Sequence, residues 1–151
     1  MKRSIFLLIS LVFLLGSCTS IYMKKSGDLA LQIAESLNEE NPLFPSEHSS
    51  VPFVFDGEIL VTTTTVSALW NGIVDGRFSI QNPVITSIEP LASEDFSIFR
   101  NSWEMEVFFK TRIPRYAYKV SIEGVEADMI LLLFRNEEKT YSVMGLKAGT
   151  E

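Results

Sequence analysis

Residues 127–147, ADMILLLFRNEEKTYSVMGLK, decide the fold. Ala127–Phe134 is a nearly continuous apolar run, which is typical of a central strand covered on both faces. The polar residues Arg135–Lys139 predict a hairpin turn, and Thr140–Lys147 is expected to return as the last strand. We therefore expect a closing hairpin whose first strand is central in the sheet.

More strands are expected upstream of this hairpin. Apolar and polar residues alternate over Tyr116–Ile122, which predicts a strand with one buried face. The same alternation over Trp103–Lys110 predicts another half-buried strand, with Glu104 and Glu106 on its solvent side. Two shorter strands are expected at Phe78–Gln81 and Val84–Ile88, and a loop is expected at Ala92–Ser102.

Two helices are expected in the N-terminal half. Leu29, Ile33 and Leu37 recur at i, i+4 and i+8 after Ser26-Gly27-Asp28, which can cap a helix that ends at Asn41-Pro42. A second apolar stripe runs along Val66–Val74. We expect Thr64 or Thr65 to cap this helix and Gly76 to end it.

Between the two helices lies the most distinctive internal stretch, Val51–Glu58. Phe53 and Phe55 precede an Asp56-Gly57 turn, and Ile59–Val61 continues as a short strand. Helices first and a meander of strands afterwards is an α+β order and not a βαβ alternation. The expected fold is therefore α+β, with N-terminal helices packed on a strongly curved, mostly antiparallel, cone-like sheet.

In this order of elements the chain resembles the nuclear transport factor 2-like superfamily over about residues 26–148. Three pieces carry the resemblance: the amphipathic helix at 28–40, the Asp56-Gly57-Glu58 turn that leads to the Val66–Val74 helix, and the closing hairpin Met129–Leu146. It implies that N-terminal helices fill the concavity of a bent sheet. The Phe55-Asp56-Gly57-Glu58 stretch with a Trp70-bearing helix after it is also similar to small lipoproteins of spirochaetes.

The first 17 residues have the parts of a secretory signal peptide. Lys2 and Arg3 form a positive head, Ile5–Leu15 is apolar apart from Ser10, and two small residues follow. An apolar run of about 11 residues is too short to cross a hydrocarbon core of roughly 30 Å as a helix. We therefore expect residues 1–17 to be removed.

Leu15-Gly16-Ser17-Cys18 resembles the bacterial lipoprotein lipobox. The resemblance implies that the leader is cut before Cys18 and that this residue is acylated, which anchors the protein in the cell envelope, facing the periplasm or the cell surface. Cys18 is the only cysteine, so an internal disulfide is impossible and acylation explains the thiol. The alternative is an ordinary cleavable leader that has a cysteine near its end.

Charge limits the partners of the mature chain. Its 134 residues carry 19 acidic and 11 basic side chains, a net charge of −8, which argues against nucleic acid and against docking of the body onto anionic lipid. Lys24 and Lys25 lie in the expected tether, Thr19–Ser26, and are the exception, because each could add about 1 kcal/mol of attraction to an anionic surface. The alternative, which we favour, is that they keep the tether soluble. One domain, 27–148, is expected to follow.

Few side chains suit chemistry. With Cys18 acylated and His48 the only histidine, no zinc site or other cofactor is expected. His48 lies in a loop rich in proline and serine and is expected to be exposed, although it could pair with Asp56 or a neighbouring serine. Asp56 and Glu58 would share a face on a strand, or Asp56 would stabilise its own turn.

Four aromatic residues could either line a pocket or form part of the hydrophobic core. Phe53, Phe55 and Trp70 could line a pocket under the cone, together with Trp103, although at this spacing aromatic residues are more often core.

Three functional hypotheses follow. The first is a non-enzymatic domain that binds a small apolar ligand or an envelope protein; its interior is expected to be filled or purely apolar, and Asp56 is expected to point into its turn. The second, implied by the resemblance, is a small isomerase or dehydratase, with His48 and a carboxylate converging in a polar cavity. The third is a homodimer through an open sheet face, in which the Trp103–Phe109 strand, Tyr116 and Tyr118 supply the apolar patch.

Overall fold

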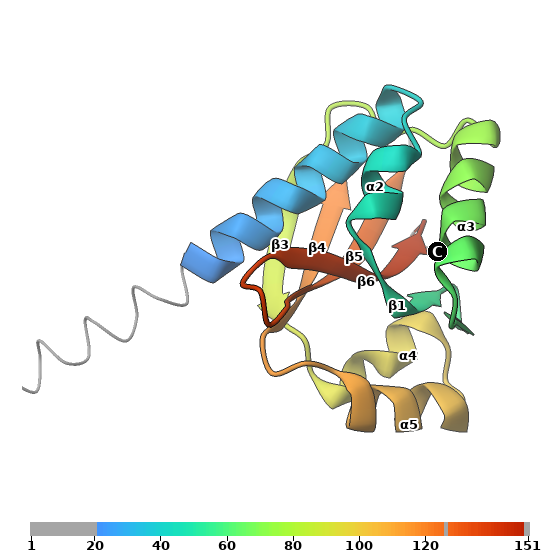
Figure 1. The fold of residues 1–151 in the computed structure, drawn as a ribbon. Helices are drawn as coiled ribbons and strands as arrows, with labels where there is room; N and C mark the ends of the chain where they lie inside the picture. Colours follow the sequence, from blue (N-terminus) through green and yellow to red (C-terminus); the bar gives the residue numbers. More distant parts are fainter. Residues whose placement is uncertain (1–20, 126, 150–151) are drawn as a thin grey trace, which may run out of the picture.

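The computed structural model describes residues 21–125 and 127–149. The expected signal peptide, the lipobox and Cys18 lie outside the described residues. In chain order the elements are a helix over residues 21–38, α2 Leu43–Glu47, β1 Ser49–Phe55, β2 Glu58–Leu60, α3 Thr63–Asp75, β3 Val84–Pro90, the 3-10 turn η1 Ser93–Asp95, α4 Phe96–Phe99, α5 Trp103–Arg112, β4 Ala117–Glu123, β5 Asp128–Arg135 and β6 Tyr141–Ala148 (Figure 1).

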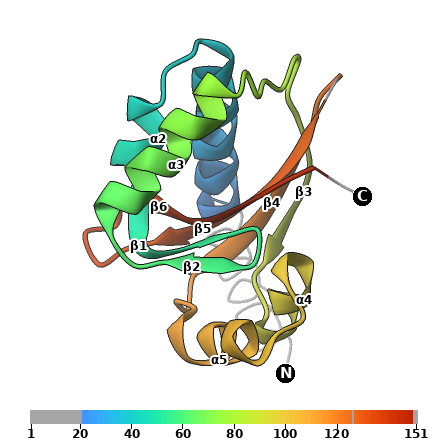
Figure 2. The ribbon, with the colours of Figure 1, turned by 90° about the vertical axis from the view of Figure 1, so that its right-hand side faces the viewer.

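The six strands form one open, curved sheet in the order β2-β1-β6-β5-β4-β3 (Figures 1 and 2). Neighbouring strands are antiparallel except for β1 and β6, which run parallel. The expected fold class, helices on a curved and mostly antiparallel sheet, is confirmed. β5 lies inside the sheet between β4 and β6, as its apolar run predicts.

One face of the sheet is covered by the N-terminal helix, α2 and α3 (Figure 2). Ile33 and Leu37 from the first helix and Trp70 from α3 are buried against Leu131 and Leu133 of β5. We call this group, completed by Phe53 and its neighbours, the first-face cluster. It contains the apolar stripes of both expected helices, and it leaves the concave side of the sheet filled.

The opposite face is covered by α4 and α5, and here the sequence prediction is wrong. The expected strand over Trp103–Lys110 is a helix, which Ser102 caps by accepting a hydrogen bond from the Met105 amide (3.3 Å). Met105, Phe108 and Phe109 recur at i, i+3 and i+4 and are buried. The second-face cluster consists of Val54, Phe99, Met105, Phe108, Phe109, Ala117, Leu132 and Met144.

The helical form of α5 also removes the premise of the homodimer hypothesis, an open sheet face. Glu104 and Glu106 lie in the first turn of α5, where acidic side chains complement the helix dipole, and Glu106 pairs with Lys110 one turn later. The apolar residue Trp103 points to solvent with 72% of its surface exposed.

Three other segments differ from expectation. Residues 21–26, which were expected to be tether, already belong to the first helix. Phe78–Gln81 is not a strand, because the side chain of Asn38 binds both backbone groups of Ile80, at 2.8 Å each, and holds this segment against the helix end. The loop expected at Ala92–Ser102 contains η1 and α4.

The hairpin turn and the C-terminal end of α3 agree with the sequence predictions, whereas the N-cap of α3 differs. Asp56 and Gly57 have φ values of 43° and 89°, as a two-residue hairpin turn between β1 and β2 requires. Thr62, and not Thr64 or Thr65, caps α3 by accepting from the Thr65 amide (3.2 Å), and Gly76 is the C-cap as expected.

Candidate functional site

The aromatic residues expected near a pocket lie mostly in the core. Phe53 and Trp70 are fully buried and meet edge to face, with ring centroids 6.0 Å apart, while Phe55 packs half-buried beside them. The Trp70 Nε1–H donates to Ser49 Oγ (2.9 Å), and the Ser49 hydroxyl donates to the Pro45 carbonyl (2.7 Å). This chain of hydrogen bonds ties α2, β1 and α3 together and gives Trp70 a structural role.

The acidic candidates lie on the surface. Asp56 stays in its turn and forms an ion pair with Lys147, with 3.1 Å between Oδ1 and Nζ. Glu58 is exposed at the start of β2. Neither carboxylate points into the first-face cluster, whose members are apolar.

His48 is half-buried rather than exposed, and it binds its own helix. Its Nδ1–H donates to the Phe44 carbonyl (2.8 Å), and the rings of His48 and Phe44 lie in contact, tilted by 31° with centroids 4.2 Å apart. Within residues 21–125 and 127–149 the buried polar side chains are Ser26 and Ser36, so none of these residues offers His48 a buried carboxylate. The described part of the chain also has no group of three His, Cys, Asp or Glu placed to hold a metal ion.

An open groove lies between the β1–β2 hairpin and α5. A cleft of about 350 Å³ is lined by Val51, Pro52, Ile59, Val61, Phe108 and Arg112. Ile59 also lines an adjoining cleft of about 560 Å³, whose rim carries Glu58, Arg100 and Glu104. Together they form what we call the hairpin groove, with an apolar floor and a rim of both charges.

The hairpin groove borders a free strand edge. β2 is the last strand on its side of the sheet, so its outer backbone groups have no strand partner there. Val61, just beyond β2, is 71% exposed. Exposed apolar side chains next to an unpaired edge suit an extended peptide that adds a strand and inserts alternate side chains.

Another open cleft, separate from the hairpin groove and of about 480 Å³, lies where the first helix and α3 end. It is lined largely by polar residues, among them Asn38, Arg77, Gln81 and Asn82. Asn38 is already engaged with Ile80. The hairpin groove is therefore the better candidate for binding apolar side chains.

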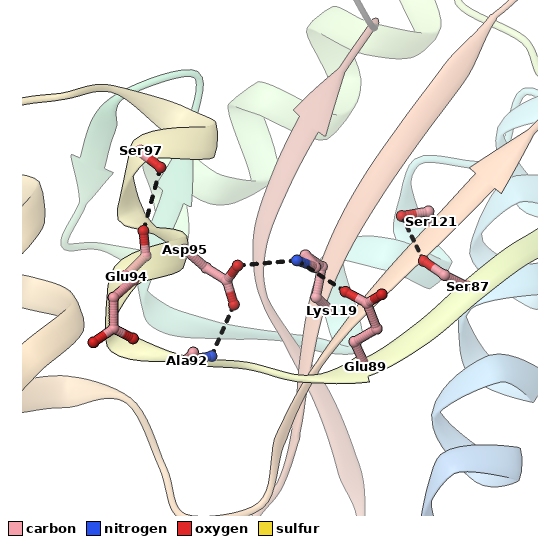
Figure 3. A network of polar contacts seen from close by, with 8 residues as sticks. All are labelled: Ser87, Glu89, Ala92, Glu94, Asp95, Ser97, Lys119 and Ser121. Atoms are coloured by element: carbon pink, nitrogen blue, oxygen red, sulfur yellow. Dashed lines mark hydrogen bonds and ion pairs between the residues drawn. The ribbon is translucent and has the colours of Figure 1, made fainter.

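A polar network on the second face anchors η1 to the sheet (Figure 3). Lys119 of β4 points between Asp95 and Glu89, with its Nζ 2.9 Å and 3.1 Å from their carboxylate oxygens, and Asp95 also accepts from the Ala92 amide (2.8 Å). Burial lowers the pKa of Lys119, but its hydrogen bonds to Asp95 and Glu89 outweigh burial and raise it. Lys119 thus stays charged and serves the fold.

Sequence reasoning missed the hairpin groove because its two walls come from distant segments. Val51 and Ile59 belong to the hairpin, whereas Phe108 and Arg112 belong to α5, which the sequence suggested to be a strand. The i, i+4 spacing of Phe108 and Arg112 was the available signal.

Comparisons with known proteins assign no relative: the chain matches no protein-family model, no curated protein and no solved structure. In the part of the chain that the structure describes, no helix has both the length and the apolarity needed to cross a bilayer.

Proposed function

We propose that this chain is the precursor of a bacterial lipoprotein whose domain resembles the nuclear transport factor 2-like superfamily. In this proposal, residues 1–17 are removed, Cys18 is acylated, and the domain stands in the cell envelope. The observation that carries the proposal is the Leu15-Gly16-Ser17-Cys18 run close before a folded domain. Two or three acyl chains would hold the domain firmly, since each buried methylene contributes about 0.8 kcal/mol.

For the domain we propose a non-enzymatic role, binding an extended segment of another envelope protein in the hairpin groove. The filled first-face cluster supports binding on the surface rather than chemistry in an interior pocket. The β1–β2 hairpin, which forms one wall of the groove, lies on the other side of the domain from the start of the first helix: in Figure 1 the helix begins on the left and the hairpin lies on the right, and in Figure 2 the hairpin faces the viewer with the helix behind it. An anchor before that helix would leave the groove open to a partner.

The anchor is tested by a Cys18→Ser variant, with membrane fractionation and mass measurement of the mature N-terminus. We expect release from the membrane and loss of acyl mass. Ser17→Ala keeps a small residue before the cut and serves as the control that retains the anchor. Unchanged membrane retention of Cys18→Ser would contradict the proposal.

The groove is tested by placing a photocrosslinking residue at position 61 in the expressing bacterium. The matched control is position 84, since Val84 is 61% exposed at the start of the opposite edge strand β3. We expect one discrete adduct from position 61, none from position 84, and loss of the adduct when Ile59→Lys places a charge on the groove floor. Equal labelling at 61 and 84 would refute a specific groove.

A further inference from the structure

The four tyrosines of the chain lie near one another, at the end of the domain where the described helix begins. The rings of Tyr22 and Tyr116 have centroids 6.2 Å apart. Behind them, burial raises the pKa of both Tyr118 and Tyr141, and in each case the nearby Tyr22 adds to the rise. Residues from the first helix, the α5–β4 loop, β4 and β6 therefore meet in one aromatic cluster.

Basic side chains cover this cluster. The Arg135 guanidinium lies 4.8 Å from the centre of the Tyr22 ring, and that of Arg115 lies 5.6 Å from the centre of Tyr116. Lys24 and Lys25 are exposed on the same end of the first helix. Cation–π contacts of this kind leave the charge available to a further anionic partner.

Basic side chains gather around the tyrosine cluster, although the mature chain as a whole carries a net negative charge. Lys139, in the β5–β6 turn beside Arg135, is the fifth basic residue here, and Glu137 and Glu138 of the same turn are its acidic neighbours in sequence. Within the described ranges, none of the five basic residues has an ion pair, whereas three lysines elsewhere are paired with carboxylates: Lys110, Lys119 and Lys147. Five of the 11 basic residues of an acidic mature chain thus lie together.

The position of this end relative to Cys18 suggests its partner. Ile21 is 54% exposed and follows Cys18 by three residues, which can span at most about 11 Å when fully extended. A bilayer that held acyl chains at Cys18 would therefore lie within reach of this surface.

We propose that the surface formed by Tyr22, Lys24, Lys25, Arg115, Tyr116 and Arg135 rests on the anionic headgroups of the bilayer in which Cys18 is anchored. The inference rests on the proposed acylation. Tyrosine rings are favoured at the membrane interface, and each basic residue near an anionic surface is attracted to it. The expectation that a net charge of −8 disfavours docking of the body treats the charge as evenly spread, and the proposal departs from that expectation at this end of the domain alone.

The test uses the leaderless chain from Cys18 to Glu151, whose only thiol is coupled to a maleimide lipid in vesicles. Acetylation of individual lysines by a water-soluble reagent is followed by mass spectrometry. On vesicles with about 30 mol % phosphatidylglycerol, Lys24 and Lys25 should react about fivefold more slowly, relative to Lys110, than in the free protein. On pure phosphatidylcholine vesicles, or in high salt, the protection should shrink.

A pair of double variants makes the test specific. Arg115→Glu with Arg135→Glu should abolish the protection, whereas Arg77→Glu with Arg100→Glu makes the same charge change at exposed arginines elsewhere and should preserve it. Equal reactivity of Lys24, Lys25 and Lys110 on anionic vesicles would overturn the proposal, as would equal effects of the two double variants. Because the coupling supplies the anchor, the result is independent of native acylation, which the mass of the mature N-terminus reports separately.

Discussion

The two faces of the sheet are covered by helices that differ in how plainly the sequence shows them. On the first face, the N-terminal helix and α3 bring one-sided apolar stripes that end in the first-face cluster. On the second face, α5 buries Met105, Phe108 and Phe109 but also carries exposed Trp103 and Val107 on its outer side. A helix that is apolar on two sides imitates the alternation of a strand, so residue pattern alone misassigns it.

The largest expected effect separates the two tryptophans. Trp70→Ala should lower the free energy of unfolding by about 3–5 kcal/mol, because it opens a cavity in the first-face cluster and leaves Ser49 without its donor. Trp103→Ala should change it by less than about 0.5 kcal/mol, since that side chain is mostly in solvent. Urea denaturation of both variants measures the difference, and similar losses would mean that α5 does not turn Trp103 outward.

The second prediction compares neighbouring residues of one strand. Leu131 belongs to the first-face cluster and Leu132 to the second-face cluster, and both are fully buried. Each substitution to Ala should cost about 2–5 kcal/mol. If only Leu131→Ala were costly in urea denaturation, α4 and α5 would not cover the second face as described.

A smaller effect compares the caps of the helices on the two faces. Thr62→Ala should cost about 1 kcal/mol, because it removes the acceptor for the Thr65 amide at the start of α3, and Ser102→Ala should cost a similar amount at α5. Thr64→Ala, in the first turn of α3, is the control and should stay within about 0.5 kcal/mol. Thermal unfolding measures the stability of all three variants. A larger loss of stability from Thr64→Ala than from Thr62→Ala would mean that Thr64, and not Thr62, caps α3.

The smallest effect concerns alkaline pH. Burial raises the pKa of Tyr118 above its ordinary value of 10.0, so the unfolded chain loses this proton first and stability falls as the pH rises above about 10. The raised pKa of Lys119 acts in the same direction. Tyr118→Phe should make the loss of stability above about pH 10 shallower, because the group whose pKa burial raises is removed. Tyr116→Phe, at a more exposed ring, is the control, and equal slopes for the two variants would contradict the prediction.

The parts of the fold that the sequence predicted are those with a strong local cause. The apolar run of β5, the Asp56-Gly57 turn and the stripe of α3 each specify their structure within a few residues, and all three were confirmed. The second face was missed because the assignment of α5 depends on which of its apolar residues meet Leu132 and Met144, and this is a long-range fact.

In the candidate site too, the sequence indicated which residues matter locally but not which distant segments meet. Phe53 and Trp70 were named as pocket or core, and their burial decides for core. The hairpin groove and the tyrosine cluster each join segments far apart in the chain, and no local pattern placed Phe108 beside Ile59 or Tyr22 beside Tyr116.

The parallel pairing of β1 with β6 affects the order in which the strands can pair during folding. The His48 carbonyl accepts from the Val143 amide (2.8 Å), so the inner edge of the hairpin strand finds its neighbour almost a hundred positions later. Pairings of such long sequence separation form late in folding. The sheet therefore cannot close until β6, the last strand in the described residues, is available to pair with β1. If residues 1–17 direct secretion as proposed above, closure of the sheet would follow transport of this last strand.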